Sequence, residues 1–217
     1  MRYDQLLFDL DGTLTDPGEG ITNSVKYALQ KWGIEVGDRR ELYRFIGPPL
    51  SASFRDFYGF SEEDSLKCVE YYREYYRNRG IFENRVYEGV PELLSRLKGE
   101  GRALILATSK PEGFAKQILE HFDLVKYFDF VAGASMDESR NKKGDVIRYA
   151  LSMASVRDLS RALMIGDREH DILGARQNSI ESLGVLYGYG DEEELRGAGA
   201  TFIAATVEEI FDVVVNN

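Results

Sequence analysis

Two aspartates two residues apart follow a short apolar run near the start of the chain. Leu6-Leu7-Phe8 is the pattern of a buried strand, and Asp9 and Asp11 come directly after it. If the extended backbone continues into the turn, this spacing points both carboxylates the same way. Close carboxylates repel one another, so the pair predicts either a bound cation or a carboxyl that keeps its proton. A solvated turn is the ordinary alternative for an isolated Asp-x-Asp-Gly.

A second pair of acids follows the apolar run at 163–165. Asp167 comes shortly after this run and Asp171 lies four residues later, so we expect both carboxylates on one face of a helix that starts there. Acidic residues in a first helical turn are also favoured by the helix dipole without any metal. If this pair converges with Asp9 and Asp11 at one edge of a sheet, the carboxylates would suit a hard cation such as Mg²⁺.

Hydroxyl groups follow another expected strand, and ammonium groups begin another expected helix. Thr108 and Ser109 end the apolar run at 103–107, just before an expected helix, where hydroxyls and free backbone N–H groups suit a phosphate oxygen. Lys142 and Lys143 begin another expected helix, where a cation could balance the carboxylates and hold phosphate. The ordinary alternatives are a helix N-cap for the hydroxyls and solvated surface side chains for the lysines.

Apolar runs alternate with helical patterns along most of the chain. After the first run, strands are expected at 103–107, 128–132, 162–165, 182–186 and 201–204. Helices are expected at 90–99, 111–121, 143–153, 169–178, 191–196 and 206–214. Strands that alternate with helices of this length need crossover connections, so we predict the α/β class with a Rossmann-like, doubly wound parallel sheet.

One segment interrupts this alternation. Residues 17–82 contain no comparable strand and show successive helical patterns near 19–32, 38–46, 50–58 and 62–79. The sequence therefore predicts two domains, a Rossmann-like catalytic core at 1–16 and 83–217 and an inserted all-helical domain at 17–82.

Composition limits the compartment and the partners. The 217 residues include 37 acidic and 27 basic side chains, a formal charge of −10, and one cysteine. No apolar run approaches the ~20 residues needed to cross a bilayer, and the first residues do not form a signal peptide. We therefore expect a cytoplasmic protein without an internal disulfide, and neither nucleic acid nor an anionic membrane as partner.

Four motifs follow one another along the chain: Asp9-Leu10-Asp11-Gly12-Thr13-Leu14-Thr15-Asp16, Ala107-Thr108-Ser109-Lys110-Pro111, Lys143, and Gly166-Asp167 with Asp171. In this order they resemble the motifs of the haloacid dehalogenase superfamily of phosphotransfer enzymes. The inserted helices then resemble the C1-type cap domain of that superfamily, and Phe45-Ile46-Gly47-Pro48-Pro49-Leu50 resembles the substrate-facing loop of its phosphoglycolate-phosphatase-like members.

The resemblance implies a role for each motif. Asp9 would attack phosphorus to give an aspartyl-phosphate, and Asp11 would protonate the leaving oxygen and later deprotonate water. Thr108, the amide of Ser109 and Lys143 would hold the transferring phosphoryl group. Mg²⁺ would be the cofactor.

The ligands that the resemblance implies for Mg²⁺ are Asp9, the carbonyl of Asp11 and Asp167, with Asp171 supporting them from behind. Many relatives follow the third-motif lysine with Pro-x-Pro, whereas this chain has Gly144-Asp145-Val146, which leaves Lys142 as a possible substitute for Lys143. True dehalogenases of the superfamily lack the second aspartate of the first motif, so the resemblance implies phosphate chemistry for a chain that carries Asp11.

The resulting expectation is a Mg²⁺-dependent phosphatase, a phosphoric monoester hydrolase resembling phosphoglycolate phosphatase, acting on a small phosphorylated metabolite. The enzyme alternatives are a 5′-nucleotidase acting on nucleoside monophosphates, a sugar-phosphate mutase and a phosphonate hydrolase. The alternative from another class is a phosphate-responsive regulatory binding module without turnover. The sequence leaves the physiological substrate, the cap residues that select it and the oligomeric state open.

Overall fold

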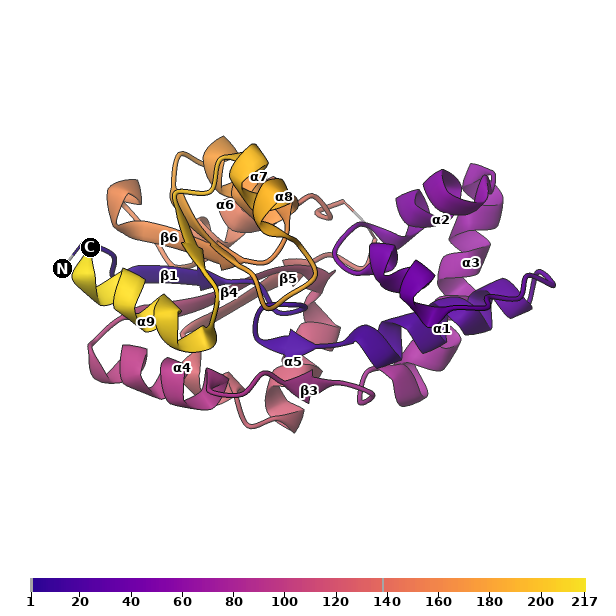
Figure 1. Cartoon of the computed structure of the whole chain (residues 1–217), viewed down its shortest axis with the longest axis horizontal. Helices are drawn as coiled ribbons and strands as arrows, with labels where there is room; N and C mark the ends of the chain where they lie inside the picture. The colour runs from indigo at the N-terminus through magenta and orange to yellow at the C-terminus, as the bar shows by residue number, and fades with distance from the viewer. Residues whose placement is uncertain (1, 138) are drawn as a thin grey trace. The chain divides into compact units, whose positions relative to one another are not determined.

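The computed structural model describes residues 2–137 and 139–217, and the chain divides into two compact units. One unit is Met1–Thr15 with Val86–Asn217, and the other is Asp16–Arg85. Figure 1 follows the chain through both units by colour. Each unit buries apolar side chains of its own.

The first unit is built on six parallel strands in the order β5-β4-β1-β6-β7-β8. Residues 6–8 and 104–107 and all of β6 are buried, as expected for a parallel sheet covered on both faces. The predicted doubly wound parallel sheet is confirmed. The strands are β1 (Gln5–Phe8), β4 (Ala103–Pro111), β5 (Phe130–Ala134), β6 (Ala162–Gly166), β7 (Glu181–Val185) and β8 (Phe202–Ala204).

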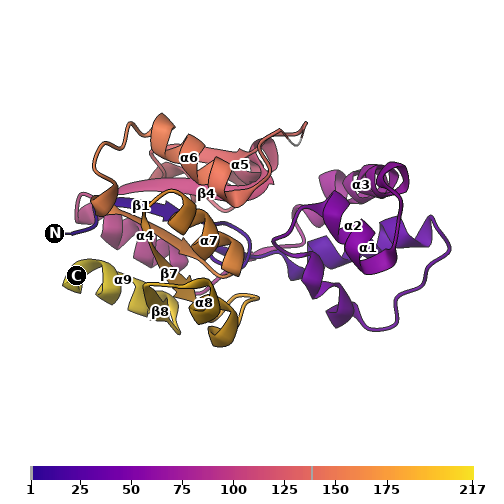
Figure 2. The same ribbon diagram turned by 90° about the horizontal axis from the view of Figure 1, so that it is seen from above.

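Helices cover both faces of this sheet. Figure 1 shows α6, α7 and α8 on one face and α4, α5 and α9 on the other, and Figure 2 looks from above onto the first of these faces. Under α6, Leu7, Ile105 and Met164 of three adjacent strands join one buried cluster with Val146 and Ile147. The helices are α4 (Val90–Gly99), α5 (Glu112–His121), α6 (Lys143–Met153), α7 (Glu169–Gln177), α8 (Glu192–Ala198) and α9 (Val207–Asn216), with short 3₁₀ helices at Val125–Tyr127 and Leu159–Arg161.

Strand β4 is longer than the apolar pattern predicts. It continues from the expected end at Ala107 to Pro111, and its pairing with β5 shifts register between these two residues. Ala107 lies opposite Ala132 and Pro111 lies opposite Ala134, so extra residues of β4 bulge at this point. Thr108, Ser109 and Lys110 therefore belong to the irregular end of a strand and not to the start of α5.

The second unit is helical, with two short strands, β2 (Thr15–Asp16) and β3 (Arg85–Val86), at its borders. The predicted helix at 38–46 is a 3₁₀ helix, and the one predicted at 62–79 ends at Tyr75 and continues as a π-helical turn. Phe45 packs edge-on against Phe54 and Phe57, with ring centroids 5.1 and 5.3 Å apart. The elements are α1 (Gly18–Gln30), η1 (Arg39–Phe45), α2 (Leu50–Tyr58), α3 (Glu62–Tyr75) and η2 (Tyr76–Gly80).

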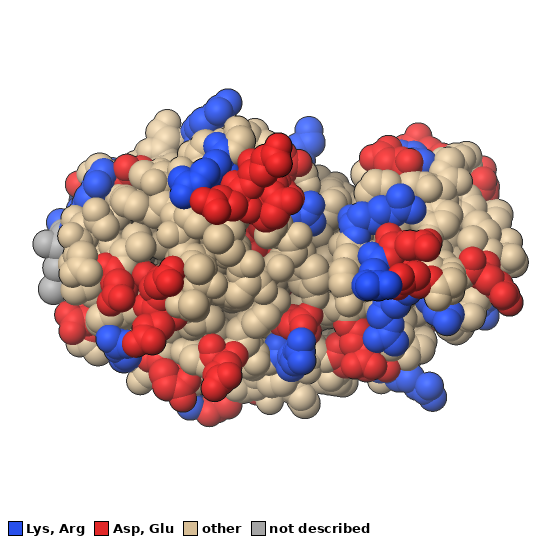
Figure 3. Space-filling model, viewed as in Figure 1, with Lys and Arg blue, Asp and Glu red and all other residues tan. Residues whose placement is uncertain are grey.

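Charged side chains of both signs are interspersed over the face drawn in Figure 3. Several form exposed pairs within single helices, such as Arg196 with Glu192 at 2.7 Å and Arg148 with Asp145 at 3.0 Å. Water and salt screen such pairs, so each contributes little to stability. Among the described residues, none of the helices combines the length and apolar character that crossing a membrane requires.

Candidate active site

Three buried carboxylates gather beyond the carboxyl ends of β1 and β6. One oxygen from each of Asp9, Asp167 and Asp171 lies within 4.8 Å of the others, and the three residues are only 6%, 0% and 1% exposed. Asp9 directly follows β1, Asp167 follows β6, and Asp171 lies in the first turn of α7. The structure therefore brings together acids from the two distant motifs, as the sequence predicted.

The prediction that Asp167 and Asp171 lie on one face of the same helix is wrong. Helix α7 begins at Glu169, so Asp167 lies in the preceding loop and the two acids do not share a helix face. Asp171 is instead the third residue of the helix, and its Oδ2 accepts a hydrogen bond from the backbone N–H of Arg168 at 3.1 Å. This hydrogen bond from the N-cap backbone fixes the carboxylate of Asp171 at the amino end of α7.

Lys143 joins two of the three carboxylates. Its Nζ lies 2.8 Å from Asp9 Oδ1 and 2.7 Å from Asp171 Oδ1, and it donates a hydrogen bond to the carbonyl of Ala107 at 3.2 Å. Burial alone would lower the pKa of Lys143, but the charges of Asp171 and Asp9 outweigh burial and raise this pKa above its usual value. Lys143 is therefore charged, whereas Lys142 is an exposed residue outside this cluster.

Asp167 is held by a loop that the sequence analysis did not single out. Its Oδ2 accepts a hydrogen bond from the backbone N–H of Tyr189 at 2.8 Å, and the hydroxyl of Thr13 lies 3.4 Å from Oδ1. The hydroxyl of Tyr187 donates to the carbonyl of Thr13 at 2.9 Å. The loop after β7 thus connects the metal-binding candidate Asp167 to the turn that follows Asp9.

The second aspartate of the first motif has a separate partner. Asp11 Oδ2 lies 2.8 Å from the Nζ of Lys110, and the backbone N–H of Lys110 donates to the hydroxyl of Thr108 at 3.2 Å. Burial raises the pKa of Asp11, and the ammonium of Lys110 opposes this rise. Thr108 is 1% exposed and Ser109 is half-buried, so the sequence-predicted hydroxyls lie on the same bulged strand end as Lys110.

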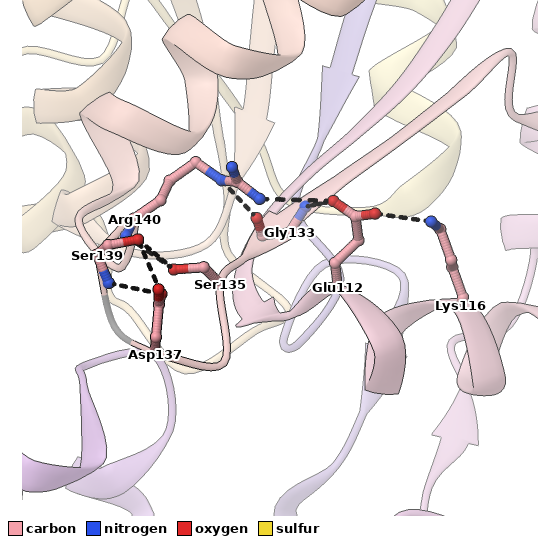
Figure 4. Close-up of polar contacts among 7 residues, drawn as sticks. All are labelled: Glu112, Lys116, Gly133, Ser135, Asp137, Ser139 and Arg140. Carbon is pink, nitrogen blue, oxygen red and sulfur yellow. Dashed lines mark hydrogen bonds and ion pairs between the residues drawn. The ribbon is translucent and has the colours of Figure 1, made fainter.

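Arg140 anchors the loop that leads into α6 (Figure 4). Its Nε donates to the carbonyl of Gly133 at 3.0 Å, its Nη2 lies 3.6 Å from Glu112 Oε2, and its guanidinium covers the ring of Tyr149 at 3.8 Å. Glu112 begins α5 and Tyr149 belongs to α6, so these contacts tie the loop to two helices. They fix the start of the helix that carries Lys143.

Comparison with known proteins decides the family. Residues 6–185 match the haloacid dehalogenase-like hydrolases. The chain belongs to this family. The resemblance of the four motifs is thus confirmed, and with it a hydrolase of the phosphatase type within the haloacid dehalogenase-like family.

This haloacid dehalogenase-like phosphatase is similar to several named proteins and to a solved structure. A 5′-nucleotidase of Pseudomonas aeruginosa is 45% identical over 214 residues, covering 99% of this chain and 96% of the relative. The tyrosine-protein kinase PtkA of Mycobacterium tuberculosis is 38% identical, covering 94% and 70%. A phosphoglycolate phosphatase of Vibrio parahaemolyticus is 29% identical, covering 96% and 95%. The crystal structure of a predicted phosphatase from Clostridium acetobutylicum superposes with a TM-score of 0.97 at 49% identity, covering 100% of both chains.

The charges at this haloacid dehalogenase-like site fit one divalent cation. With Asp11 included, four carboxylates face the ammonium groups of Lys110 and Lys143, which leaves a formal charge of −2 when all are ionised. Burial, together with Asp171 and Asp9, raises the pKa of Asp167 well above its usual value. Burial also raises the pKa of Asp171, to about 6, although Lys143 opposes it. A hard cation would relieve this repulsion, and the donors are all oxygens.

Gly188→Ala is expected to disturb the support of Asp167. A Cβ at position 188 would lie 2.4 Å from both the Cβ of Asp167 and the carbonyl oxygen of Gly12, so one of them must move. We expect unfolding free energy to fall by about 1–3 kcal/mol, as for overpacked cores, and the Mg²⁺ concentration for half-maximal activity to rise about tenfold or more.

Gly197→Ala in α8 is the matched control, since a Cβ there meets nothing within 4 Å. It should leave the Mg²⁺ requirement unchanged and slightly stabilise the helix. Urea unfolding and Mg²⁺ titration of activity check both variants, and equal Mg²⁺ requirements in the two would remove the loop from metal binding.

Proposed function

We propose that this chain is a Mg²⁺-dependent phosphatase that hydrolyses nucleoside 5′-monophosphates through an aspartyl-phosphate. The buried cluster of Asp9, Asp167 and Asp171 with Lys143 supports the reaction class. The substrate class rests on similarity, because the relative named 5′-nucleotidase is 45% identical and the phosphoglycolate phosphatase 29%. This ranking reverses the order expected from the sequence alone, in which phosphoglycolate came first.

The residues of the site divide the two steps of this reaction between them. A carboxylate oxygen of Asp9 forms a bond to phosphorus while the bond from phosphorus to the ester oxygen breaks, and Asp11 gives its proton to the departing oxygen. Water then attacks the aspartyl-phosphate, and Asp11 takes a proton from it, which releases phosphate and restores Asp9. Thr108, the amide of Ser109 and Lys143 hold the phosphoryl oxygens.

Asp9, Asp167 and the carbonyl of Asp11 would hold Mg²⁺, with Asp171 positioned behind them by its bonds to Lys143 and Arg168. When bound, Mg²⁺ would neutralise the negative charge that Asp9 and the phosphoryl oxygens bring together. Without that neutralisation, the mutual repulsion of an anionic substrate and four carboxylates opposes binding.

A substrate panel tests the function directly. Phosphate release is measured with AMP, phosphoglycolate and p-nitrophenyl phosphate, each in Mg²⁺ and in EDTA. We expect activity only with Mg²⁺ and a kcat/KM for AMP about tenfold or more above that for phosphoglycolate. A preference for phosphoglycolate would overturn the nucleotidase assignment, and equal rates in EDTA would overturn the metal requirement. Absence of phosphate release from all three would favour a binding module.

Thermal unfolding gives a second readout of the metal. The pKa of Asp171 is raised to about 6 in the folded protein, so ionisation destabilises the metal-free fold as pH rises through that value. Because Mg²⁺ competes with these protons, we expect Mg²⁺ to raise the unfolding midpoint more at about pH 8 than at about pH 5. An equal rise at both would argue against binding at the carboxylates.

A further inference from the structure

The ion pair between Lys110 and Asp11 is the most buried charge contact of this site outside the cluster around Lys143. Nζ and Oδ2 are 2.8 Å apart, and the two side chains are only 5% and 12% exposed. Because both side chains are buried, water and salt do not screen this ion pair as they screen pairs on the surface. Holding a long lysine side chain in one geometry also costs conformational entropy, and burying its charge costs desolvation free energy. The roles proposed above make no use of Lys110.

The bulged end of β4 explains why Lys110 reaches Asp11. Thr108 and Lys110 are both buried, and the hydroxyl of Thr108 accepts the backbone N–H of Lys110 at 3.2 Å. This bond fixes the backbone of the bulge between the two residues. The same three-residue segment therefore carries both the hydroxyl that the proposed function assigns to the phosphoryl group and the ammonium that pairs with Asp11.

The two oxygens of Asp11 are not equivalent. Oδ2 is bound by Lys110, whereas Oδ1 is buried and makes no hydrogen bond within the described residues. An ammonium on one oxygen restricts rotation of the carboxyl group and leaves the other oxygen available for proton exchange. Proton transfer needs the donor within hydrogen-bond reach of the reacting oxygen, and a misplacement of about 1 Å costs about 10²-fold in rate.

We propose that Lys110 is a positioning residue that orients the carboxyl group of Asp11 for proton transfer to the leaving oxygen. This inference rests on the proposed function, because it assigns Lys110 a task in that same reaction. It differs from the assignment of Lys143, which pairs with Asp9 and Asp171 and would contact the phosphoryl group.

The test compares substrates whose leaving groups differ in their need for a proton. Nitrophenolate leaves as a stable anion, whereas the alkoxide of AMP or phosphoglycolate must be protonated as it leaves. We measure kcat/KM for p-nitrophenyl phosphate and for the better of these two alkyl esters, because this constant reports the steps up to the first irreversible one. Both values come from one preparation, so their ratio does not depend on the fraction of folded protein.

Lys110→Met should lower kcat/KM for the alkyl ester by about 10²-fold, the lower end of typical general acid contributions, and for p-nitrophenyl phosphate by less than about tenfold. Lys110→Gln, whose amide can still donate a hydrogen bond, should fall between Lys110→Met and the wild type. Lys116→Met is the matched control, because this exposed lysine pairs with Glu112 at 2.7 Å on the surface of α5. The ratio of the two kcat/KM values in Lys116→Met should equal that of the wild type.

Two results would overturn the proposal. An unchanged ratio in Lys110→Met would mean that Lys110 acts only on the fold. A rise in the inhibition constant of inorganic phosphate as large as the loss in kcat/KM would mean that Lys110 binds the phosphoryl group itself. If the wild type hydrolyses none of the three esters, the proposed function fails and the ratio has no meaning, so the two failures are distinguishable.

Discussion

Asp9→Asn is expected to lower the turnover of p-nitrophenyl phosphate by at least about 10³-fold while the protein stays folded. An amide of the same shape cannot form the acyl phosphate, and the lysine contact at 2.8 Å from Asp9 Oδ1 leaves the chemistry of attack to the carboxylate that the substitution removes. Lys143 keeps its pair with Asp171 at 2.7 Å, and one of several repelling carboxylates loses its charge. The metal-free variant should therefore unfold at a temperature close to that of the wild type.

Single-turnover kinetics and a thermal unfolding curve in EDTA check this expectation. Asp145→Asn is the control, since this exposed acid of α6 pairs with Arg148 on the surface and should leave turnover unchanged. Turnover by Asp9→Asn near the wild-type rate would place the nucleophile elsewhere. Loss of turnover together with loss of the folded state would instead show that Asp9 is structural.

The strands were predictable because a sheet buried on both faces demands continuous apolar residues. The expected and observed bounds of β1, β6 and β7 differ by one residue, and those of β5 by two. The apolar pattern did not predict the last residues of β4, because Thr108, Ser109 and Lys110 are polar although their backbone remains in the sheet. An apolar pattern marks where side chains are buried among other side chains, not where backbone pairing stops.

The acids of the site were predictable for a different reason. Carboxyl ends of parallel strands share one edge, so residues following β1 and β6 had to lie near each other once the sheet was predicted. That topological argument placed Asp9 beside Asp167 correctly. The local argument, which put Asp167 and Asp171 on one helix face, was wrong because α7 begins two residues after Asp167.

The supporting contacts were not predictable from local pattern. Tyr187 and Thr13 are 174 residues apart in the chain, and only the folded sheet brings their hydroxyl and carbonyl together. The topology could have indicated this loop, because it follows the carboxyl end of β7, which lies next to the carboxyl end of β6. For Lys110 the signal was its place at the carboxyl end of β4, which neighbours β1 in the sheet, because residues that follow adjacent parallel strands share one edge.

Lys143→Met tests the charge balance of the site and is expected to affect both stability and turnover. Methionine keeps much of the aliphatic volume but leaves Asp9 and Asp171 without their shared cation. Removing one partner of a buried ion pair costs about 3–5 kcal/mol of unfolding free energy in proteins. We expect the lower end of this range, about 3 kcal/mol, at neutral pH in EDTA, because Asp171 already has a pKa of about 6 and can take up a proton in response.

Turnover of Lys143→Met should fall by about 10²–10³-fold, the usual loss when one contact to a developing charge is removed. Lys142→Met is the closest control, because this neighbouring lysine is exposed, and it should change unfolding free energy by less than about 0.5 kcal/mol and leave turnover intact. Urea unfolding in EDTA and steady-state rates in Mg²⁺ measure the two effects.

Adding Mg²⁺ should recover part of the stability of Lys143→Met, because a divalent cation supplies the positive charge that the carboxylates have lost. It should not recover turnover, because the contact to the phosphoryl group is still missing. Equal effects of the two substitutions would contradict the assignment of Lys143, and so would full recovery of turnover by Mg²⁺ alone.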